Sequence, residues 1–395
     1  MLFTVSGQDV RAQERAGSST VKVVTTEPRP DTSEGPQPAR RISTQHEWHY
    51  GGFVDLGYML DFNHPANHLF RNRGTTPRVN ELDLNMAGLY LNKDASAKSR
   101  FGMELLLQAG QDSKEFGFSA TAPNLPGAHW LSQLGRANVS YLAPVGRGLT
   151  VQAGIFNSLI GYESLYAKDN FTYTRSWGAD YSPYLMMGVN ATYPFTNKLT
   201  GTLFVINGYF HLAHPNNSPS FGGQIAYQAT EQLALKETLF YGPQQSNTAL
   251  EYWRFFTDSI AEWKEKPVTT AFEYQAGTEN LAAGGNPRVF WTAAQLPVHW
   301  AVKGPWSVTV RPEILLDPDG RMTESRQFVK AVTITLEYRV PCRWTNTIAR
   351  LEYRFDDSTG RGGGFFRDGY AQPGLVQLTP TQHLLVFGLI WTLDP

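Results

Sequence analysis

The stretch ARLEYRFD, residues 349–356, alternates apolar and charged side chains at every position. Successive side chains of a β-strand point to opposite faces. An extended 349–356 segment therefore has one face of Ala, Leu, Tyr and Phe and another of Arg, Glu, Arg and Asp. Four charges on one face are hard to place in a packed soluble core, because buried charges need partners. They cost little if they face water inside a barrel whose outer face contacts lipid, so we predict a membrane strand with a wet inner face.

Three further segments repeat this alternation. The apolar side chains that we predict to face outward are Leu82, Leu84, Met86 and Tyr90; Phe101, Met103, Leu105 and Leu107; and Val332, Ile334, Leu336 and Tyr338. Pro297 and Pro312 fall inside predicted strands, although proline removes a donor from the hydrogen-bond ladder. From Trp48 to Leu393 the pattern predicts about 16 strands, with roughly 14 or 18 as alternatives for an even-numbered barrel.

The connections between these segments alternate strictly between short and long. The short connections are Asn92–Lys98, Pro144–Gly148, Thr196–Lys198, Thr230–Glu231, Glu262–Lys266, Lys303–Pro305 and Pro341–Arg343. The longer, more polar connections are Asn63–Pro77, Ser113–Trp130, Leu159–Ala179, His214–Pro219, Pro243–Thr248, Thr278–Pro287, Pro318–Glu324 and Asp357–Pro380. Such asymmetry is typical of bacterial outer-membrane barrels, which have short periplasmic turns and long extracellular loops. We predict an all-β, transmembrane, antiparallel up-and-down β-barrel.

The composition of the chain supports a membrane barrel over a large soluble β protein, which is the competing interpretation. The 395 residues include 34 basic and 35 acidic side chains, so nothing suggests nucleic-acid binding. Charged residues make up 17%, below the roughly 25% of ordinary soluble domains. No stretch reaches the roughly 18 apolar residues of a transmembrane helix. Aromatic residues lie near predicted strand ends, as in interfacial girdles: Tyr58, Tyr90, Tyr141, Tyr193, Phe195, Trp263, Trp300, Trp306, Trp344 and Trp391.

The chain divides into two predicted regions, a disordered tail over 1–45 and the barrel over 46–395. Residues 17–45 are rich in Ser, Thr, Pro and Glu and have no periodicity. Val10-Arg11-Ala12 resembles the end of a signal-peptide cleavage site, so we expect the tail to begin with the remnant of a signal peptide that starts upstream of Met1. The single cysteine, Cys342, excludes an intramolecular disulfide.

A barrel of about 16 strands leaves an aqueous channel, and we expect the 159–179 loop to fold into it. The alternative is a loop lying over the rim with its charges solvated. The candidate constriction residues of this loop are Tyr162, Glu163, Tyr166, Lys168, Asp169, Asn170, Tyr173 and Arg175. On the wall, we predict a basic stripe of Arg100, Arg136, Arg254, Arg311, Arg350 and Arg354 opposite Glu81, Asp83, Glu104 and Glu352. The alternative for these wall charges is a set of structural ion pairs.

No catalytic or metal-binding constellation emerges from the sequence. His64 with His68, and His211 with His214, lie in loop-like or strand-end sequence beside prolines, where the helical spacing of metal ligands does not apply. Asp317-Pro318-Asp319-Gly320 lacks the remaining ligands of a calcium loop and predicts a tight turn. His299 and His383 have no nucleophile motif beside them. We therefore expect no enzymatic activity, no metal and no cofactor.

Four stretches of the chain resemble a known family. The stretches AGIFNSLIGYE (153–163) and DNFTYTRS (169–176), together with RLEYRFDD (350–357) and the closing strand Leu384–Trp391, are similar to the OmpL-like family of β-barrel porins. The similarity extends from about Trp48 to the C-terminus. It implies an outer-membrane barrel and passive solute diffusion. One departure is that Thr392–Pro395 follows Trp391, whereas outer-membrane strands usually end on an aromatic residue, which bears on recognition by the barrel-assembly machinery.

The expected function is a water-filled channel for small hydrophilic solutes in the bacterial outer membrane. The expected partners are those solutes, outer-membrane lipid, the barrel-assembly machinery and, by analogy with porins of this size, two further copies in a homotrimer. A surface or adhesion protein that binds through its long loops, with the barrel as an anchor, is the alternative. A soluble β-rich binding protein is a third class.

Overall fold

The computed structural model describes residues 48–115, 128–213, 216–245, 250–282, 287–341 and 345–393. The expected tail, Cys342, Trp344 and His214 lie outside these residues. Within them, no helix is both long enough and apolar enough to cross a membrane.

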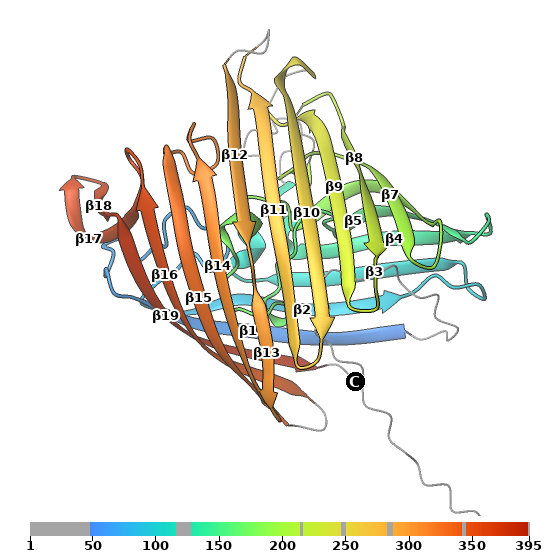
Figure 1. Ribbon diagram of the computed structural model, residues 1–395, viewed down its shortest axis with the longest axis horizontal. Helices are drawn as coiled ribbons and strands as arrows, with labels where there is room; N and C mark the ends of the chain where they lie inside the picture. Colours follow the sequence, from blue (N-terminus) through green and yellow to red (C-terminus); the bar gives the residue numbers. More distant parts are fainter. Residues whose placement is uncertain are drawn as a thin grey trace, which may run out of the picture. The chain divides into compact units, whose positions relative to one another are not determined.

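The described chain forms one closed antiparallel barrel, shown in Figure 1. Apart from β12 and β13, each strand of the wall pairs with the next wall strand along the chain, and β1 closes the barrel by pairing with β19, for example Gly52 with Leu393. The wall strands are β1 (Trp48–Asp61), β2 (Leu82–Lys93), β3 (Phe101–Ala109), β4 (Leu134–Ala143), β5 (Leu149–Asn157), β6 (Leu185–Pro194), β7 (Leu199–Ile206), β8 (Ser220–Gln228), β9 (Leu233–Pro243), β10 (Trp253–Glu265), β11 (Val268–Asn280), β12 (Arg288–Gln295), β13 (Val298–Lys303), β14 (Trp306–Asp317), β15 (Gln327–Val340), β16 (Asn346–Thr359) and β19 (Thr381–Leu393).

Strands β12 and β13 are two halves of one wall strand, because both pair with β11 and β14. Counted this way, the 17-stranded sheet is a barrel of 16 strands among the described residues, as predicted. Pro297 lies in the gap between the halves, where its missing N–H removes a ladder bond. Pro312 stays within β14, and its carbonyl accepts from Leu296 N at the same gap.

Short segments outside the wall lie in the long connections. They are the 3-10 turns η1 (Asp112–Glu115), η2 (Ala128–Gln133), η3 (Ala167–Asp169) and η4 (Leu250–Tyr252), the one-turn helix α1 (Trp177–Asp180) and the hairpin β17 (Phe365–Gln372)–β18 (Leu375–Thr379). The turn predicted at 317–320 is present: the Asp317 carboxylate accepts from the backbone nitrogens of Arg321, Met322 and Thr323.

The predicted alternation of faces is confirmed in β3, β15 and β16 and is wrong in part of β2. In β16 the apolar side chains face outward, while Arg350, Glu352, Arg354 and Asp356 are all buried inside. In β2 a bulge shifts the register, so that Asp55 pairs with Met86 and Leu56 with Leu84. The extra residue, Asn85, reverses the phase beyond it. Met86 and Tyr90 therefore face inward and pack with Phe53, and Leu89 faces outward instead.

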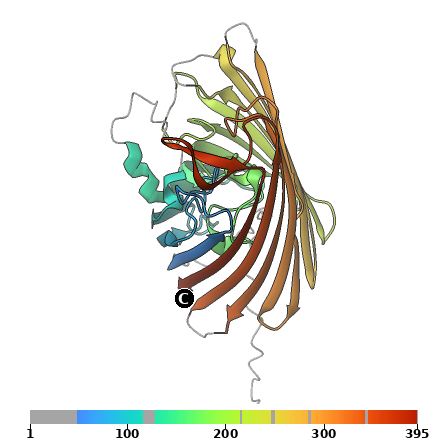
Figure 2. The ribbon, with the colours of Figure 1, turned by 90° about the vertical axis from the view of Figure 1, so that its left-hand side faces the viewer.

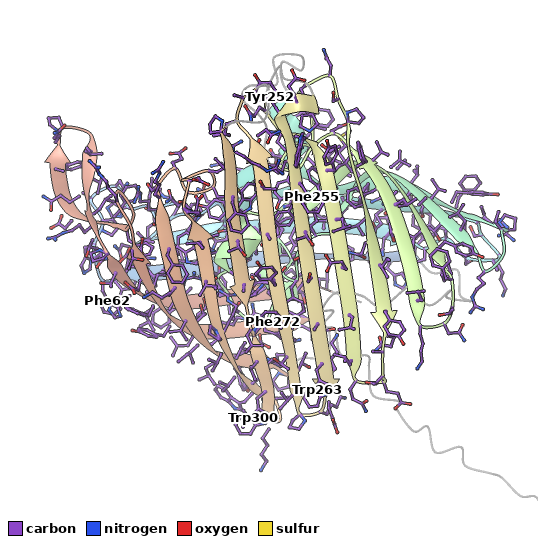
Figure 3. All side chains as sticks on the ribbon, turned by 45° about the horizontal axis from the view of Figure 1, so that its top comes forward. Phe62, Tyr252, Phe255, Trp263, Phe272 and Trp300 are labelled. Atoms are coloured by element: carbon purple, nitrogen blue, oxygen red, sulfur yellow. The ribbon has the colours of Figure 1, made fainter. Side chains whose placement is uncertain are left out.

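Aromatic side chains mark two levels on the outer wall. Trp263 and Trp300 lie near the short-turn end, and Tyr252 and Phe255 lie near the long-loop end (Figure 3). Such girdles are expected at the two membrane interfaces. Phe272 lies between the two levels in the same view.

Candidate functional site

The connection between β5 and β6, residues 158–184, folds into the barrel and is here called the internal loop. Figure 2 shows it inside the ring of strands. Local hydrogen bonds give it a compact shape: the Asn170 side chain bonds both the nitrogen and the carbonyl of Ser164. The hydroxyl of Ser176 caps α1 by accepting from Ala179 N. The expectation that the 159–179 segment enters the barrel agrees with this placement.

One side of the internal loop is bonded to β16. The Glu352 carboxylate accepts from the backbone nitrogens of Tyr173 and Thr174, at 2.6 and 2.9 Å. The Arg350 guanidinium donates to the carbonyls of three loop residues, Ala167, Asn170 and Thr172. Arg354 donates to the carbonyl of Arg175 at 2.9 Å. The alternating charges of β16 thus bind loop backbone, because the loop covers them.

A second side of the loop contacts the strands at the start of the barrel. The Tyr173 hydroxyl donates to Asp55 of β1 at 2.6 Å and accepts from the Asn85 side chain of β2 at 2.6 Å. Asn85, the extra residue of the β2 bulge, therefore provides a hydrogen bond to the internal loop. The Tyr166 hydroxyl donates to Gln108 of β3 at 2.8 Å.

A third set of contacts fixes the beginning of the loop to β10 and β11. The backbone nitrogen of Gly161 donates to Asp258 at 2.8 Å, and that of Tyr162 donates to Glu273 at 2.8 Å. The Tyr162 hydroxyl donates to Glu262 at 3.0 Å. Burial and the nearby Glu262 carboxylate raise the pKa of Tyr162 well above its ordinary value. The loop is therefore bonded to three separate sectors of the wall and narrows the space between them.

Glu163 and Arg311 form the main ion pair between the loop and β14. Arg311 Nη1 lies 2.5 Å from Glu163 Oε1, and the second Glu163 oxygen accepts from Ser176 N at 2.7 Å. Burial alone would raise the pKa of Glu163, but Arg311 and Ser176 hold it below its ordinary value. The nitrogen of Trp177 donates to Glu313 of the same strand. Its indole donates to Asp356 of β16 at 2.8 Å.

The two preceding long loops secure the end of the internal loop. Arg73 pairs with Asp180 at 2.9 Å, and Arg175 pairs with Asp112 at 3.1 Å; all four side chains are fully buried. Asp112 also accepts from Thr76 N at 2.7 Å. Burial raises the pKa of Asp112 to about 7, although Arg175 opposes this shift.

Few of the eight candidate residues of the loop keep contact with solvent. Tyr166, Tyr173 and Arg175 are buried against the wall or the other loops. Lys168 and Asp169, which pair at 2.7 Å, retain side-chain exposures of 19% and 25%. Phe171 is partly exposed and stacks on His299 of β13, with ring centroids 4.2 Å apart. Asp169 and Phe171 also border a hollow, whose lining residues are Tyr162, Glu163, Asp169, Asn170, Phe171, Thr172 and Pro297.

The wall candidates divide into buried ion pairs and peripheral charges. Arg311, Arg350, Glu352 and Arg354 are buried under the internal loop, and Arg254 pairs with Glu279 at 2.8 Å. The prediction that these five residues face water is wrong. The internal loop covers Arg311, Arg350, Glu352 and Arg354, whereas Arg254 lies against the rings of Tyr209 and Trp291. The arginines instead form the ion pairs of the alternative interpretation. Glu352 also lies on the same strand as Arg350 and Arg354, so it does not oppose them.

The remaining wall candidates lie away from these buried pairs. Glu81 precedes β2 and pairs with Arg78, while Arg100 precedes β3 and donates to the Leu142 carbonyl. Glu104 accepts from Asn138 at 3.0 Å, and the Arg136 guanidinium lies 5.9 Å from the centre of the Tyr166 ring. Asp83 is partly exposed on β2.

Sequence reasoning missed several polar residues that anchor the loop, namely Asp55, Gln108, Asp112, Asp258, Glu262, Glu273 and Glu313. Most of them occupy alternate positions within strands, such as Asp258 and Glu262 of β10. This period was a usable signal, although it does not say which inward positions meet the loop. Among the described residues, no three His, Cys, Asp or Glu side chains are grouped to hold a metal ion.

The sequence matches the family described as "Putative beta-barrel porin-2, OmpL-like" over residues 47–393. No curated protein matches it. The fold is similar to that of the anion-selective porin from Comamonas acidovorans, with a TM-score of 0.55 and 14% identity, covering 88% of this chain and 100% of that one. Salmonella typhi OmpF in complex with daunomycin gives a TM-score of 0.56 and 10% identity, with coverages of 88% and 98%. Pseudomonas putida OprB gives a TM-score of 0.54 and 8% identity, covering 89% of this chain and 94% of that one.

Proposed function

This chain belongs to the OmpL-like family of β-barrel porins, and we propose that it passes small hydrophilic solutes by diffusion through a lumen that the internal loop narrows. As a member of this family it is an integral outer-membrane porin. The surface-adhesion alternative is not favoured. No chemistry is required of a passive channel, so the proposed function needs neither a catalytic residue nor a cofactor.

The attachment of the internal loop to three wall sectors supports the proposed filter. Bonds to β16, to β1–β3 and to β10–β11 hold the loop inside the barrel. Solutes must then pass whatever part of the lumen the loop leaves open. Charged side chains at a narrow point select ions by direct electrostatics.

The eight candidate residues receive two proposed roles. Lys168 and Asp169, with Phe171 beside them, form the solvent-accessible face that filters solutes by charge and size. Tyr162, Glu163 and Asn170 belong to this first group, because they line the same hollow as Asp169 and Phe171. Tyr166, Tyr173 and Arg175 hold the loop in place from its buried side.

The proposed assembly consists of a barrel domain at 46–395, preceded by residues 1–45 as a separate region, and forms a homotrimer in outer-membrane lipid. Insertion by the barrel-assembly machinery is part of this proposal. The accompanying proposal is that the protein has no enzymatic activity.

Single-channel recording of the purified protein in planar bilayers tests the channel, and liposome swelling with a series of sugars tests the filter. We expect stepwise conductance, and swelling rates that fall as sugar size increases. Replacing residues 164–172 with a short Gly-Ser linker should raise conductance and admit larger sugars. A well-folded protein that never conducts would contradict the channel; a linker variant with unchanged sugar cutoff would contradict the filter alone.

A further inference from the structure

One sector of the inner wall carries no charge. On β4–β8, the inward positions between the internal loop and the short turns hold only uncharged side chains. Cross-strand partners share a face, and the buried residues Asn190 and Thr202 pair with Gln152 and Thr192. The polar, partly exposed residues of this sector are here called the neutral wall and are Ser140, Thr150, Gln152, Thr192, Gln224 and Gln228.

Charged side chains border the neutral wall and lie opposite it. Glu104 on β3 and Lys236 on β9 are its charged neighbours. In the order of the 16 wall strands β5 is eight strands from β14, so the neutral wall faces β14–β16 across the lumen. On that side Arg311, Glu352 and Arg354 are buried because they bond to the internal loop. The loop thus covers charged wall and leaves uncharged wall partly exposed.

Hydrogen bonds orient the groups of the neutral wall without using all of their capacity. Gln152 donates to Asn138 at 2.8 Å and accepts from Asn190 at 3.0 Å. A side-chain amide has two N–H donors and an oxygen that accepts two bonds. Gln152 therefore keeps one donor and one acceptor unused among the described residues. Thr192 and Thr202 share a single bond of 2.9 Å, which needs only one of their two hydroxyl hydrogens.

We propose, on the basis of the channel function above, that the neutral wall binds uncharged polyhydroxylated solutes, such as sugars and sugar alcohols, and makes them the preferred solute class. A solute hydroxyl both donates and accepts, so amide and hydroxyl side chains can replace the water that it loses at the wall. Charged side chains are what favours ions in a pore, and the neutral wall has none. The exposed charges of the loop, Lys168 and Asp169, pair with each other and add no net charge.

Three open-chain six-carbon probes test the solute class, because they differ in charge but hardly in size: glucitol, gluconate and protonated glucamine. Each is added to the purified protein in a planar bilayer, and the fall in ion conductance is measured against probe concentration. We expect glucitol to reduce conductance saturably, with half-saturation at a several-fold lower concentration than either charged probe. A glucitol effect that does not saturate, or tighter half-saturation by a charged probe, would overturn the solute class and leave the channel intact. A folded protein that never conducts would overturn the channel and the solute class together.

Variants of Gln152 locate the binding on the neutral wall. Gln152→Leu should raise the half-saturating glucitol concentration about fivefold or more, the effect of one lost hydrogen bond. The matched control is Gln133→Leu, at an exposed residue of η2, which should leave that concentration unchanged. Equal glucitol titrations for the original protein and Gln152→Leu would refute binding at this wall.

Gln152→Glu gives a second measurement, in case Gln152→Leu does not fold. It keeps the size of the side chain and adds a charge, so the reversal potential in a KCl gradient should shift towards cations. An unchanged reversal potential would mean that position 152 does not line the path, which would also refute the neutral wall. Heat-modifiable gel mobility establishes which variants are folded.

Discussion

Glu352 of β16 and Tyr173 of the internal loop are joined by a hydrogen bond of 2.6 Å from the Tyr173 nitrogen to a buried carboxylate oxygen. The other carboxylate oxygen accepts from Thr174 N at 2.9 Å. The carboxylate of the wall and the backbone N–H groups of the loop are all buried, and each group needs a hydrogen-bond partner there. These two hydrogen bonds provide the partners for both sides. A charged wall strand is thereby compatible with an interior that the loop fills at this point.

Removing this carboxylate should free the internal loop. Glu352→Ala leaves the donors of Tyr173, Thr174 and Thr335 without their acceptor. Breaking a buried charged contact of this kind costs about 3–5 kcal/mol. We expect a larger mean conductance and more open-channel noise in planar bilayers.

The matched control for Glu352→Ala is Glu81→Ala, the same substitution at a partly exposed side chain beside β2. It should leave conductance and noise near their original values. Identical recordings from the original protein and the Glu352→Ala variant would show that this contact does not hold the loop.

Lys168 and Asp169 should set ion selectivity in opposite directions. Both are partly exposed, and charges about 4 Å apart interact by about 1 kcal/mol even in water. Lys168→Gln should therefore shift the reversal potential in a KCl gradient towards cations by a several-fold change in permeability ratio, and Asp169→Asn should shift it towards anions.

Arg175→Gln provides the contrast to these selectivity variants, because Arg175 is buried and paired with Asp112. Its main effect should be a lower unfolding temperature. If Arg175→Gln changed ion selectivity more than Lys168→Gln did, Arg175 rather than Lys168 would act in the filter, and the proposed assignment would be wrong.

The barrel was predictable because a lipid-facing wall imposes a period of two on every strand. The 349–356 stretch and the alternation of short and long connections both follow from that requirement. The bulge at Asn85 was not predictable, since one inserted residue changes the phase without a distinctive residue type. Met86 and Tyr90 were consequently placed on the wrong face.

The site was predictable only in outline. The inward direction of Arg350, Glu352 and Arg354 follows from the strand period. Their burial depends on the position of the internal loop, which is more than 170 residues away in sequence. For the same reason the sequence placed Arg175 among lumen-facing charges, although it pairs with Asp112 from another loop. The alternation along a strand predicts which face of the wall a side chain is on. The residue that it contacts there can be identified only from the tertiary structure.

Phe171 should limit the size of permeating solutes. Its ring stacks on His299 beside the solvent-accessible face of the loop. Phe171→Ala removes the ring and should raise the liposome-swelling rate for larger sugars more than for small ones. The control is Phe195→Ala, an exposed aromatic residue in the connection between β6 and β7. Equal swelling profiles for the two variants would exclude Phe171 from the size filter.

Asp112 should make the stability of the loop assembly depend on pH. Its pKa in the folded protein is about 7, against an ordinary value of 3.8, chiefly because the carboxyl is buried. The folded state therefore binds this proton more tightly than the unfolded state does. Its contribution to stability is complete below about pH 4 and is lost as the pH rises through 7. We expect the free energy of unfolding to fall between pH 5 and pH 8, by an amount on the order of 1–4 kcal/mol.

Asp112→Asn tests this linkage, because the amide oxygen can still accept from Thr76 N but the side chain cannot ionise. Urea unfolding in detergent, followed by tryptophan fluorescence at pH 5, 6, 7 and 8, should show a shallower pH dependence for the variant. Asp169→Asn, which removes a partly exposed carboxylate, should keep the original slope. Equal slopes for the original protein and Asp112→Asn would mean that the titrating group is another one. A stability that rises between pH 5 and pH 8 and flattens in Asp112→Asn would instead mean that the pairing with Arg175 outweighs the burial of the carboxyl.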